Sequence, residues 1–462
     1  MSFFTRYSNK SEFNLIVDSV LTNAKAYLNK EIVDCSIAIE NDKIFKIGKE
    51  TQMPNADRKT NLENMLVLPG LIDVHVHLRD EGKAYKEDFY TGTAAAAAGG
   101  ITTVLDMPNN DPVTMSAETV KNRMRIAETR SLVNIGFYSE FPKDLGEVGD
   151  IAAQGAVGFK LFLARKIGGL NIDDDESLRE AFRTVGELGI PVAVHAEDKT
   201  LLTTNEEKLK RANRHDATAF LKAHSERVEL KAVKRLLEVS AQTGVRLHFC
   251  HITTEESLNN VVEAKKSGRT VTCEVTPHHL LLSSADYEHY GLMLTIMPPL
   301  RGENSIKALW KGVADGMVDI LGSDHAPHAL NEKSSGSVWD VKVGVPGLET
   351  MLPLMLTMVK KNRISLGNVV QLLAEKPAEI FNLRGRGSLA QGKKADLTVV
   401  DFKRKFTINA SKFHSKAKFS PFDGWEVQGY PMKTFVNGLL VMDEQDIVTK
   451  AGSGEIIRGD HA

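Results

Sequence analysis

The chain has 462 residues, with 58 basic and 60 acidic side chains and a formal net charge of −2. Charged residues make up 26% and hydrophobic residues 42%, which is ordinary for a soluble protein with one large domain and a smaller one. Such a balance gives no electrostatic footprint for nucleic acid or an anionic membrane, so we expect neither as a partner.

The cysteines and the N-terminus bear on the compartment. Cys35, Cys250 and Cys273 show no CxxC spacing, which is typical of reduced, buried thiols in a cytosolic protein. The first residues, MSFFTRYSNKSEF, lack the long apolar core and the cleavage site of a signal peptide. No run approaches the roughly 18 apolar residues of a membrane span. We therefore expect a cytoplasmic protein.

In chain order, short strands are expected first, up to about residue 66, in the runs LIVDSVLTN, CSIAIEN and KIFKIGK. From residue 71, short apolar runs alternate with helical stretches such as SAETVKNRMRIAE and DESLREAFRTVGELG. The eight runs are 71–78, 101–107, 133–139, 157–163, 191–197, 246–252, 271–277 and 319–326. Eight strands alternating with helices over about 255 residues predict an α/β fold, a (β/α)₈ barrel of the TIM type.

Strand character returns after helical segments at about 347–382, in GSLAQGKKADLTVVDF and KTFVNGLLVMDEQDIV. The simplest arrangement joins both chain ends in one small β-sandwich domain. We predict that residues 1–66 and 386–448 form this domain and that residues 67–385 form the barrel with extra helices. The polar residues 449–462 are expected to be a mobile tail.

Polar side chains stand at the ends of several predicted barrel strands, where the active sites of such barrels lie. They are His75 and His77 in the first strand, Lys160 in the fourth, His195 in the fifth, His251 in the sixth and Asp324 in the eighth. His75 and His77 alternate along an extended chain, so both imidazoles share a face and can bind one divalent ion. A barrel built only for stability would carry Val, Ile or Leu at these positions. The convergence therefore predicts a metal site.

Lys160 is unusual because an ammonium ion would be costly to desolvate and would repel metal cations. Burial should favour the free amine, which can add carbon dioxide to form a carbamate that bridges two metals. The alternative is a lysine that reaches the rim or binds substrate as a cation.

Asp324 can ligate one metal and take the proton of a hydroxide that the two metals share, first as general base and then as general acid. The alternative is an Asp that caps a strand-to-helix turn. His325 and His328 follow closely, and either is a candidate for an outer contact to the metals or for a substrate contact.

Several strings resemble class I dihydroorotases of the amidohydrolase superfamily. They are PGLIDVHVHLRD, KEDF, AAAAAGGITTVLDMPNNDPVT, GFKLFL, VHAED, HFCHIT, CEVTPHHLLL, SDHAPH and GVPGLETMLPLML, within residues 66–400. The resemblance implies reversible cyclisation of N-carbamoyl-L-aspartate to L-dihydroorotate and water, a step in pyrimidine (UMP) synthesis. It also implies two divalent metal ions, for which zinc is the expectation at a His-rich site.

The resemblance also implies the role of each residue. His75, His77, carboxylated Lys160 and Asp324 would hold the more buried metal, and Lys160, His195 and His251 the more exposed one. Arg79 and Asn109 would bind the α-carboxylate of the substrate with help from His328, and a guanidinium fork suits a carboxylate. The alternatives are a surface salt bridge for Arg79 and a turn residue for Asn109.

The seventh strand ends with Glu274, His278 and His279, which are candidates for outer contacts to the metals or for an accessory cation site. A hydrogen-bonded structural cluster is the interpretation we favour. Three features depart from the family: Glu81 stands where Pro is usual, Met297 stands where Asn or Arg is frequent, and ARKIGGLNIDDDE follows Lys160. We expect Glu81 to alter a loop and not the ligands. At Met297 only a backbone contact is expected, and no loop contacts are assigned by analogy after Lys160.

Other functions remain as alternatives. An allantoinase shares the fold and the ligands, but the LRD arginine, KEDF, MPNN and the SDHAPH histidine argue against it. A hydantoinase does not need Arg79 to hold a carboxylate. A metal-free scaffold that docks partners would have lost ligand residues, and none of the six is lost here. The resemblance further implies a homodimer and a weak association with aspartate transcarbamoylase.

Overall fold

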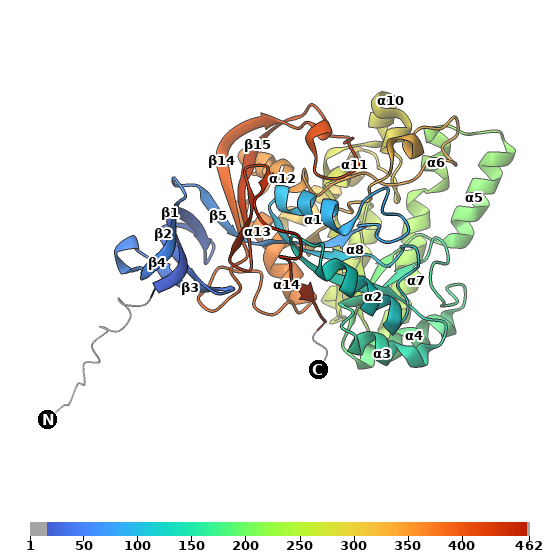
Figure 1. Cartoon of the computed structure of the whole chain (residues 1–462). Coiled ribbons are helices and arrows are strands. Elements are labelled where there is room, and N and C mark those ends of the chain that lie inside the picture. The colour runs from blue at the N-terminus through green and yellow to red at the C-terminus, as the bar shows by residue number, and fades with distance from the viewer. Residues whose placement is uncertain (1–15, 460–462) are drawn as a thin grey trace.

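The computed structural model describes residues 16–459, and its main body is a barrel of parallel strands surrounded by helices (Figure 1). The strands are β6 (Leu71–Val76), β7 (Ile101–Asp106), β8 (Asn134–Glu140), β9 (Gly158–Phe162), β10 (Pro191–His195), β11 (Arg246–Phe249), β12 (Val271–Val275) and β13 (Ile320–Leu321). They pair in chain order, each parallel to the next. A parallel bridge between Val76 and His325 closes the ring. The predicted (β/α)₈ barrel is thus confirmed.

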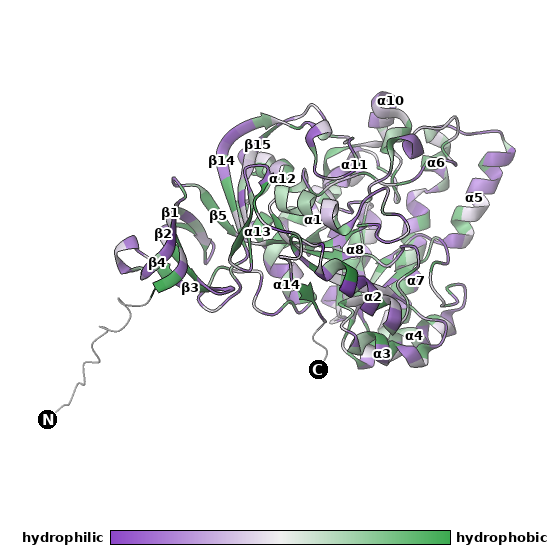
Figure 2. Ribbon diagram, viewed as in Figure 1, coloured by the Kyte–Doolittle hydropathy of each residue, from purple (hydrophilic) through white to green (hydrophobic). Residues whose placement is uncertain are grey.

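Helices cover the outside of this barrel. In chain order they are α1 (Phe89–Ala98), α2 (Ala117–Glu128), α3 (Val148–Ala153), α4 (Asp175–Glu187), α5 (Lys199–Arg211), α6 (Ala217–Ala223), α7 (Glu226–Thr243), α8 (Glu255–Lys266), α9 (Pro277–Leu281), α10 (Tyr287–Tyr290), α11 (Glu303–Ala314), α12 (Met351–Lys360), α13 (Leu366–Val370) and α14 (Lys376–Ile380). Helix α5 projects away from the barrel and is largely hydrophilic, with Leu202 its one buried residue (Figure 2). Within residues 16–459, no helix is long and apolar enough to cross a membrane.

Helix α2 shows how the local sequence sets the helical layer. Its N-cap Ser116 accepts a hydrogen bond from the backbone N–H of Thr119, which defines where the helix begins. Its buried face consists of Val120, Arg123, Met124 and Ala127, the i, i+3, i+4, i+7 spacing of an amphipathic helix. Arg123 is thus a charged residue within an otherwise apolar stripe.

Both chain ends contribute to a second sheet, as predicted. Its strands are β1 (Ile16–Leu28), β2 (Glu31–Glu40), β3 (Lys43–Gly48), β4 (Asn55–Asn61), β5 (Leu66–Pro69), β14 (Leu397–Thr407), β15 (Glu426–Val436), β16 (Leu439–Asp443) and β17 (Asp446–Ile447). The two ends join where β5 runs antiparallel to β14, with Val67 opposite Val399. Strand β1 pairs with β4 along its first part and with β5 near its end, and its antiparallel pairing with β2 shifts register between Leu21 and Ala24.

The prediction of a mobile tail after residue 448 is wrong for the part that the structure describes. Strand β18 (Ile456–Ile457) runs parallel to β8 and pairs Ile456 with Ile135. Ile457 is buried, so burial of an apolar side chain adds to the backbone hydrogen bonds that hold this segment. Residues 1–15 and 460–462 lie outside the described residues, and with them the expectation about a signal peptide and the end of the tail.

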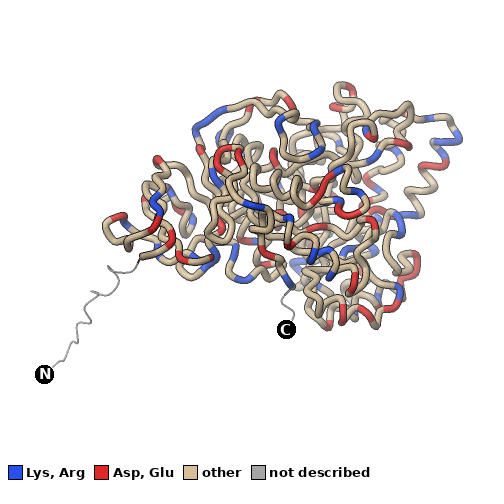
Figure 3. The backbone as a smooth tube through the Cα atoms, viewed as in Figure 1, with Lys and Arg blue, Asp and Glu red and all other residues tan. Residues whose placement is uncertain are grey.

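Basic and acidic residues are interspersed along the described chain (Figure 3). This distribution agrees with the near-zero net charge, and it leaves the polar groups inside the barrel mouth as the chemically distinctive feature.

Candidate active site

The six residues predicted as metal ligands lie at the C-terminal ends of the barrel strands, and the structure brings them together. Asp324 Oδ1 lies 3.3 Å from Nε2 of both His75 and His77. The ring centroids of His75 and His251 are 5.3 Å apart, and those of His195 and His251 are 4.8 Å apart. All four histidines and Lys160 are buried, whereas 13% of the Asp324 side chain is exposed. The site therefore opens to solvent beside Asp324.

Three of the four histidines have one ring nitrogen held by an acceptor on the outside of the cluster. His75 Nδ1 contacts Glu274, His77 Nδ1 lies 2.7 Å from Asn109 Oδ1, and His195 Nε2 lies 2.8 Å from Glu197 Oε2. The other ring nitrogen of each points inward, toward Asp324 for His75 and His77 and toward His251 Nε2, at 3.1 Å, for His195. An imidazole held in this way presents an unprotonated nitrogen, as a metal ligand requires.

The electrostatics also fit a cation. Burial lowers the pKa of His77 to about 3 and holds the pKa of His251 well below its usual value, so both rings are neutral. Burial acts against the charged form of His75 too, but Glu274 and Asp324 outweigh it and raise its pKa. The two carboxylates around His75 thus favour a positive charge there, which a divalent ion at Nε2 would supply. The donor set therefore fits divalent metal ions.

Lys160 is completely buried next to this cluster. Its Nζ lies 2.8 Å from Cys250 Sγ and 5.0 Å from the centre of the Phe162 ring. No carboxylate lies within ion-pair distance of it among the described residues. A second group of potential ligand atoms, from His75, Cys250 and Glu274, lies within 4.8 Å of one another, as do those of His75, His77 and Asp324.

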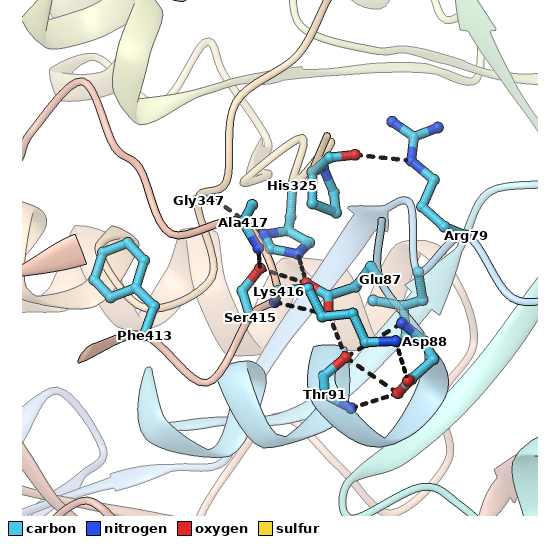
Figure 4. A network of polar contacts seen from close by, with 12 residues as sticks. Arg79, Glu87, Asp88, Thr91, His325, Gly347, Phe413, Ser415, Lys416 and Ala417 are labelled. Atoms are coloured by element: carbon cyan, nitrogen blue, oxygen red, sulfur yellow. Dashed lines mark hydrogen bonds and ion pairs between the residues drawn. The ribbon is translucent and has the colours of Figure 1, made fainter. Parts of the chain in front are cut away.

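The three residues predicted to bind a carboxylate lie at the edge of the cluster of predicted metal ligands. Arg79 Nη2 is 3.4 Å from His328 Nε2. Arg79 Nε donates to the backbone oxygen of Pro327 at 3.3 Å (Figure 4). Burial lowers the pKa of Arg79 to about 10, so its guanidinium remains charged at neutral pH. Asn109 accepts from His77 through its oxygen, so its amide nitrogen is the atom suited to a substrate.

The structure separates the residues predicted to make outer contacts. Glu274 contacts His75 directly and also accepts from His248 Nε2, at 3.2 Å, and from the backbone N–H of His251, at 3.1 Å. His279 is held by Thr276 and by the Pro298 backbone oxygen. Thus Glu274 supports the ligand cluster through its side chain, whereas both ring nitrogens of His279 bind other parts of the fold.

His325 also turns its ring away from the cluster. Its Nδ1 accepts from the backbone N–H of Gly347 at 3.1 Å, and its Nε2 lies 3.3 Å from Glu87, which Ser415 of the second sheet's β14–β15 connection also contacts (Figure 4). Only the backbone oxygen of His325 reaches the site, where it accepts from His77 N–H at 2.8 Å.

Comparison with known proteins agrees with this geometry. The model of the amidohydrolase family matches residues 66–441. A dihydroorotase of Methanosarcina acetivorans is 38% identical over 96% of each chain, and one of Pyrococcus horikoshii is 36% identical over 96% of this chain and 97% of its own. The solved L-hydantoinase of Arthrobacter aurescens has a TM-score of 0.92 and 31% identity, covering 96% of this chain and 100% of its own.

The chain belongs to the amidohydrolase family. Its relatives and its site make it a hydrolase that acts on cyclic amides.

In this amidohydrolase, the positions that depart from the dihydroorotase pattern have defined places. The Glu81 side chain accepts from Asn122 Nδ2 of α2 at 2.7 Å. Met297 packs in a small apolar cluster with Ala164. After Lys160, Leu170 and Ile172 are buried in the main core, which anchors the segment that the sequence left unassigned.

Sequence reasoning missed several polar residues of this amidohydrolase. Glu197 joins His195 to His224, with Glu197 Oε1 2.8 Å from His224 Nδ1. Lys86 Nζ lies 3.1 Å from His328 Nδ1 and 2.8 Å from Glu332. The spacing of His195 and Glu197 follows the alternation already used for His75 and His77, and it could have identified Glu197.

Proposed function

We propose that this amidohydrolase is a dihydroorotase that interconverts N-carbamoyl-L-aspartate and L-dihydroorotate. One observation carries the proposal: a buried, charged Arg79 lies beside His328 at the edge of the candidate metal-ligand cluster. A cyclic amide without a carboxylate gives such a guanidinium no partner, and a buried unpaired charge is costly. The similar dihydroorotases support the same substrate.

The substrate would lie between Arg79 and the metal cluster. Arg79 and the Asn109 amide would hold the α-carboxylate. His328 would assist from beside Arg79: its Nδ1 accepts from Lys86 Nζ, and its Nε2–H donates to the Val343 backbone oxygen at 2.9 Å. The carbon that reacts is the side-chain carboxyl of carbamoyl aspartate, or the ring carbonyl that it becomes. This carbon would face Asp324.

We propose two divalent ions, with zinc as the expectation. His75, His77, Asp324 and a carbamate on Lys160 would hold one, and His195, His251 and the same carbamate the other. When bound, the ions would polarise the reacting carbonyl and make a water molecule more acidic. The complete burial of Lys160 beside these ligands supports the carbamate, because a carboxylate on this stem is better matched to two cations than an ammonium is.

Asp324 would move the proton. Burial acts to raise its pKa, but the neighbouring His75 and the hydrogen bond from His77 outweigh burial and hold the pKa well below its usual value. Asp324 is therefore ionised before the reaction and can accept a proton from the attacking water. In hydrolysis it would then pass this proton to the leaving amide nitrogen, and in cyclisation the transfer would run in reverse.

Hydantoinase is the second candidate, because an L-hydantoinase of Paenarthrobacter aurescens is 32% identical over 95% of this chain. A direct test supplies carbamoyl aspartate, dihydroorotate, allantoin and hydantoin side by side to metal-reconstituted protein. We expect turnover of the first two. Turnover of hydantoin or allantoin alone would contradict the proposal. A protein that binds no metal and turns over none of the four compounds would favour a non-catalytic scaffold that docks partners.

The function has consequences for location and assembly. We propose a cytoplasmic homodimer, with residues 1–66 and 386–448 as one domain beside the barrel of residues 67–385. A weak association with aspartate transcarbamoylase is proposed with it. Sedimentation of the protein alone tests the homodimer, and sedimentation with that enzyme tests the association. A monomer whose sedimentation does not change when the enzyme is added would contradict both.

A further inference from the structure

Arg79 has an unusual backbone. Its φ is 65°, in the left-handed region that non-glycine residues seldom occupy. Such a conformation persists only where the surroundings fix the chain on both sides. The direction of the Arg79 side chain therefore depends on what holds Leu78 and Asp80.

One buried ion pair holds both neighbours. The backbone N–H of Leu78 donates to Asp106 Oδ1 at 2.8 Å. Arg123 of α2 contacts the other oxygen of Asp106 and also donates to the backbone oxygen of Asp80. The chain before Arg79 is thus bound to Asp106 and the chain after it to Arg123, and the two side chains are bound to each other.

The ion pair is rigid because of its packing. Asp106 is fully buried and Arg123 is 2% exposed. The guanidinium lies 5.0 Å from the centre of the Phe89 ring and 5.4 Å from that of Phe137, and these two rings pack edge to face. A buried guanidinium packed against two rings has little freedom to move, so its hydrogen bonds point in a fixed direction.

The same pair lies close to the other carboxylate-binding residue. Asp106 ends β7, three residues before Asn109. Helix α2 adds one more contact to the loop, from Asn122 Nδ2 to Glu81 at 2.7 Å. The end of β7 and helix α2 therefore fix the backbone on both sides of Arg79, whereas the Asn109 side chain is held by His77 of the ligand cluster.

We propose that Arg123 is a positioning residue for recognition of the substrate's α-carboxylate: through Asp106 and the Asp80 backbone it sets the aim of Arg79 without touching the substrate. The inference rests on the proposed function, because it assumes that Arg79 binds a carboxylate. Helix α2, on the outside of the barrel, would thereby contribute to substrate specificity.

A double-mutant cycle on the full-length, metal-loaded protein tests it, with Arg79→Met, Arg123→Met and the double variant assayed on dihydroorotate. We expect Arg79→Met to raise KM by about 10- to 100-fold and Arg123→Met to raise it by about 10-fold, with kcat within about twofold. The double variant should have the same KM as Arg79→Met alone, because loss of Arg123 can misalign the Arg79 side chain only where that side chain is present. Metal content should be unchanged throughout.

Controls separate positioning from general stability. Arg123→Lys keeps the positive charge but loses the second nitrogen of the guanidinium. Its KM should therefore lie between those of the unmodified protein and Arg123→Met. Lys121→Met, at an exposed position of the same helix, should leave KM and kcat unchanged. If Arg123→Met does not fold, Asn122→Ala removes the 2.7 Å contact to Glu81 and should raise KM by about two- to threefold, again only when Arg79 is present.

The outcomes distinguish two failures. Multiplicative effects of Arg79→Met and Arg123→Met on KM, or a fall in kcat and metal content with Arg123→Met, would overturn the inference and leave the proposed function standing. An unmodified protein that turns over neither dihydroorotate nor carbamoyl aspartate would overturn the proposed function and the inference with it.

Discussion

The two halves of the candidate site are built differently. The proposed metal half includes His75 in β6, His77 directly after it, and Asp324 beside the bridge that joins His325 to Val76. The carboxylate half consists of Arg79, Asn109 and His328, which lie in the loops beyond the strand ends. Strand ends fix the chemistry and loops fix the substrate, as is general for such barrels. Damage to the metal half should therefore lower kcat, and damage to the carboxylate half should raise KM.

The largest expected effect is at Lys160. Lys160→Ala removes the stem of the proposed carbamate, so it should lose one or both metals and lower kcat by about 10⁴-fold or more. Metal analysis beside the assay checks this. As a control, bicarbonate should speed the recovery of activity when metal is added to the unmodified metal-free protein and should not help the variant. Near-normal turnover of Lys160→Ala with both metals bound would refute the carbamate.

Asp324→Asn should have the next largest effect. The variant cannot accept the proton of the attacking water, so kcat should fall by about 10²- to 10⁴-fold, while KM should change little because the carboxylate half is intact. Steady-state kinetics in both directions measures the split. A large rise in KM with normal kcat would mean that Asp324 binds substrate, and the division of the site into halves would break down.

Glu197→Gln changes a residue that contacts the predicted metal ligand His195 without being a ligand itself, so it tests whether the metal half can be weakened without affecting the carboxylate half. It weakens the hold on His195 Nε2, so metal affinity should fall by about 10- to 100-fold, with the KM of fully loaded protein unchanged. Competition with a chelator measures this affinity. Glu206→Gln is a matched control, because Glu206 Oε1 lies 3.8 Å from His224 and one contact further from the metals. Equal losses in both variants would contradict the role given to Glu197.

The smallest effect is on the equilibrium. Cyclisation consumes the side-chain carboxylate at the metal half and leaves the α-carboxylate at the carboxylate half, so one proton is taken up. Lower pH should favour ring closure by about tenfold per unit above the pKa range of carboxylates. Product ratios after long incubation from either direction test this. An equilibrium that does not change with pH would mean that a different bond is made.

The sequence alone determined the barrel, and it predicted the six residues that the structure brings together at the barrel mouth. Period-two alternation placed His75 and His77 on one face, and the ends of parallel strands meet at one rim, so local pattern was enough to bring distant histidines together. The segment Ile456–Ile457 shows the limit of this reasoning: composition indicated a tail, whereas its pairing with β8 depends on a strand that is in place only once the barrel has folded.

The tertiary structure decided which polar neighbours serve the site. His279 and His325 stand beside the key motifs yet turn to Pro298 and Glu87, while Glu274, 199 residues from His75 in sequence, contacts it directly. Arg123 occupies an ordinary helix position in the sequence. Only the folded structure shows that its guanidinium packs against Phe89 and Phe137 and donates to the backbone oxygen of Asp80, next to Arg79. Spacing along the chain determines on which face of a strand or helix a side chain lies, but the partner that the side chain contacts depends on how separate elements pack.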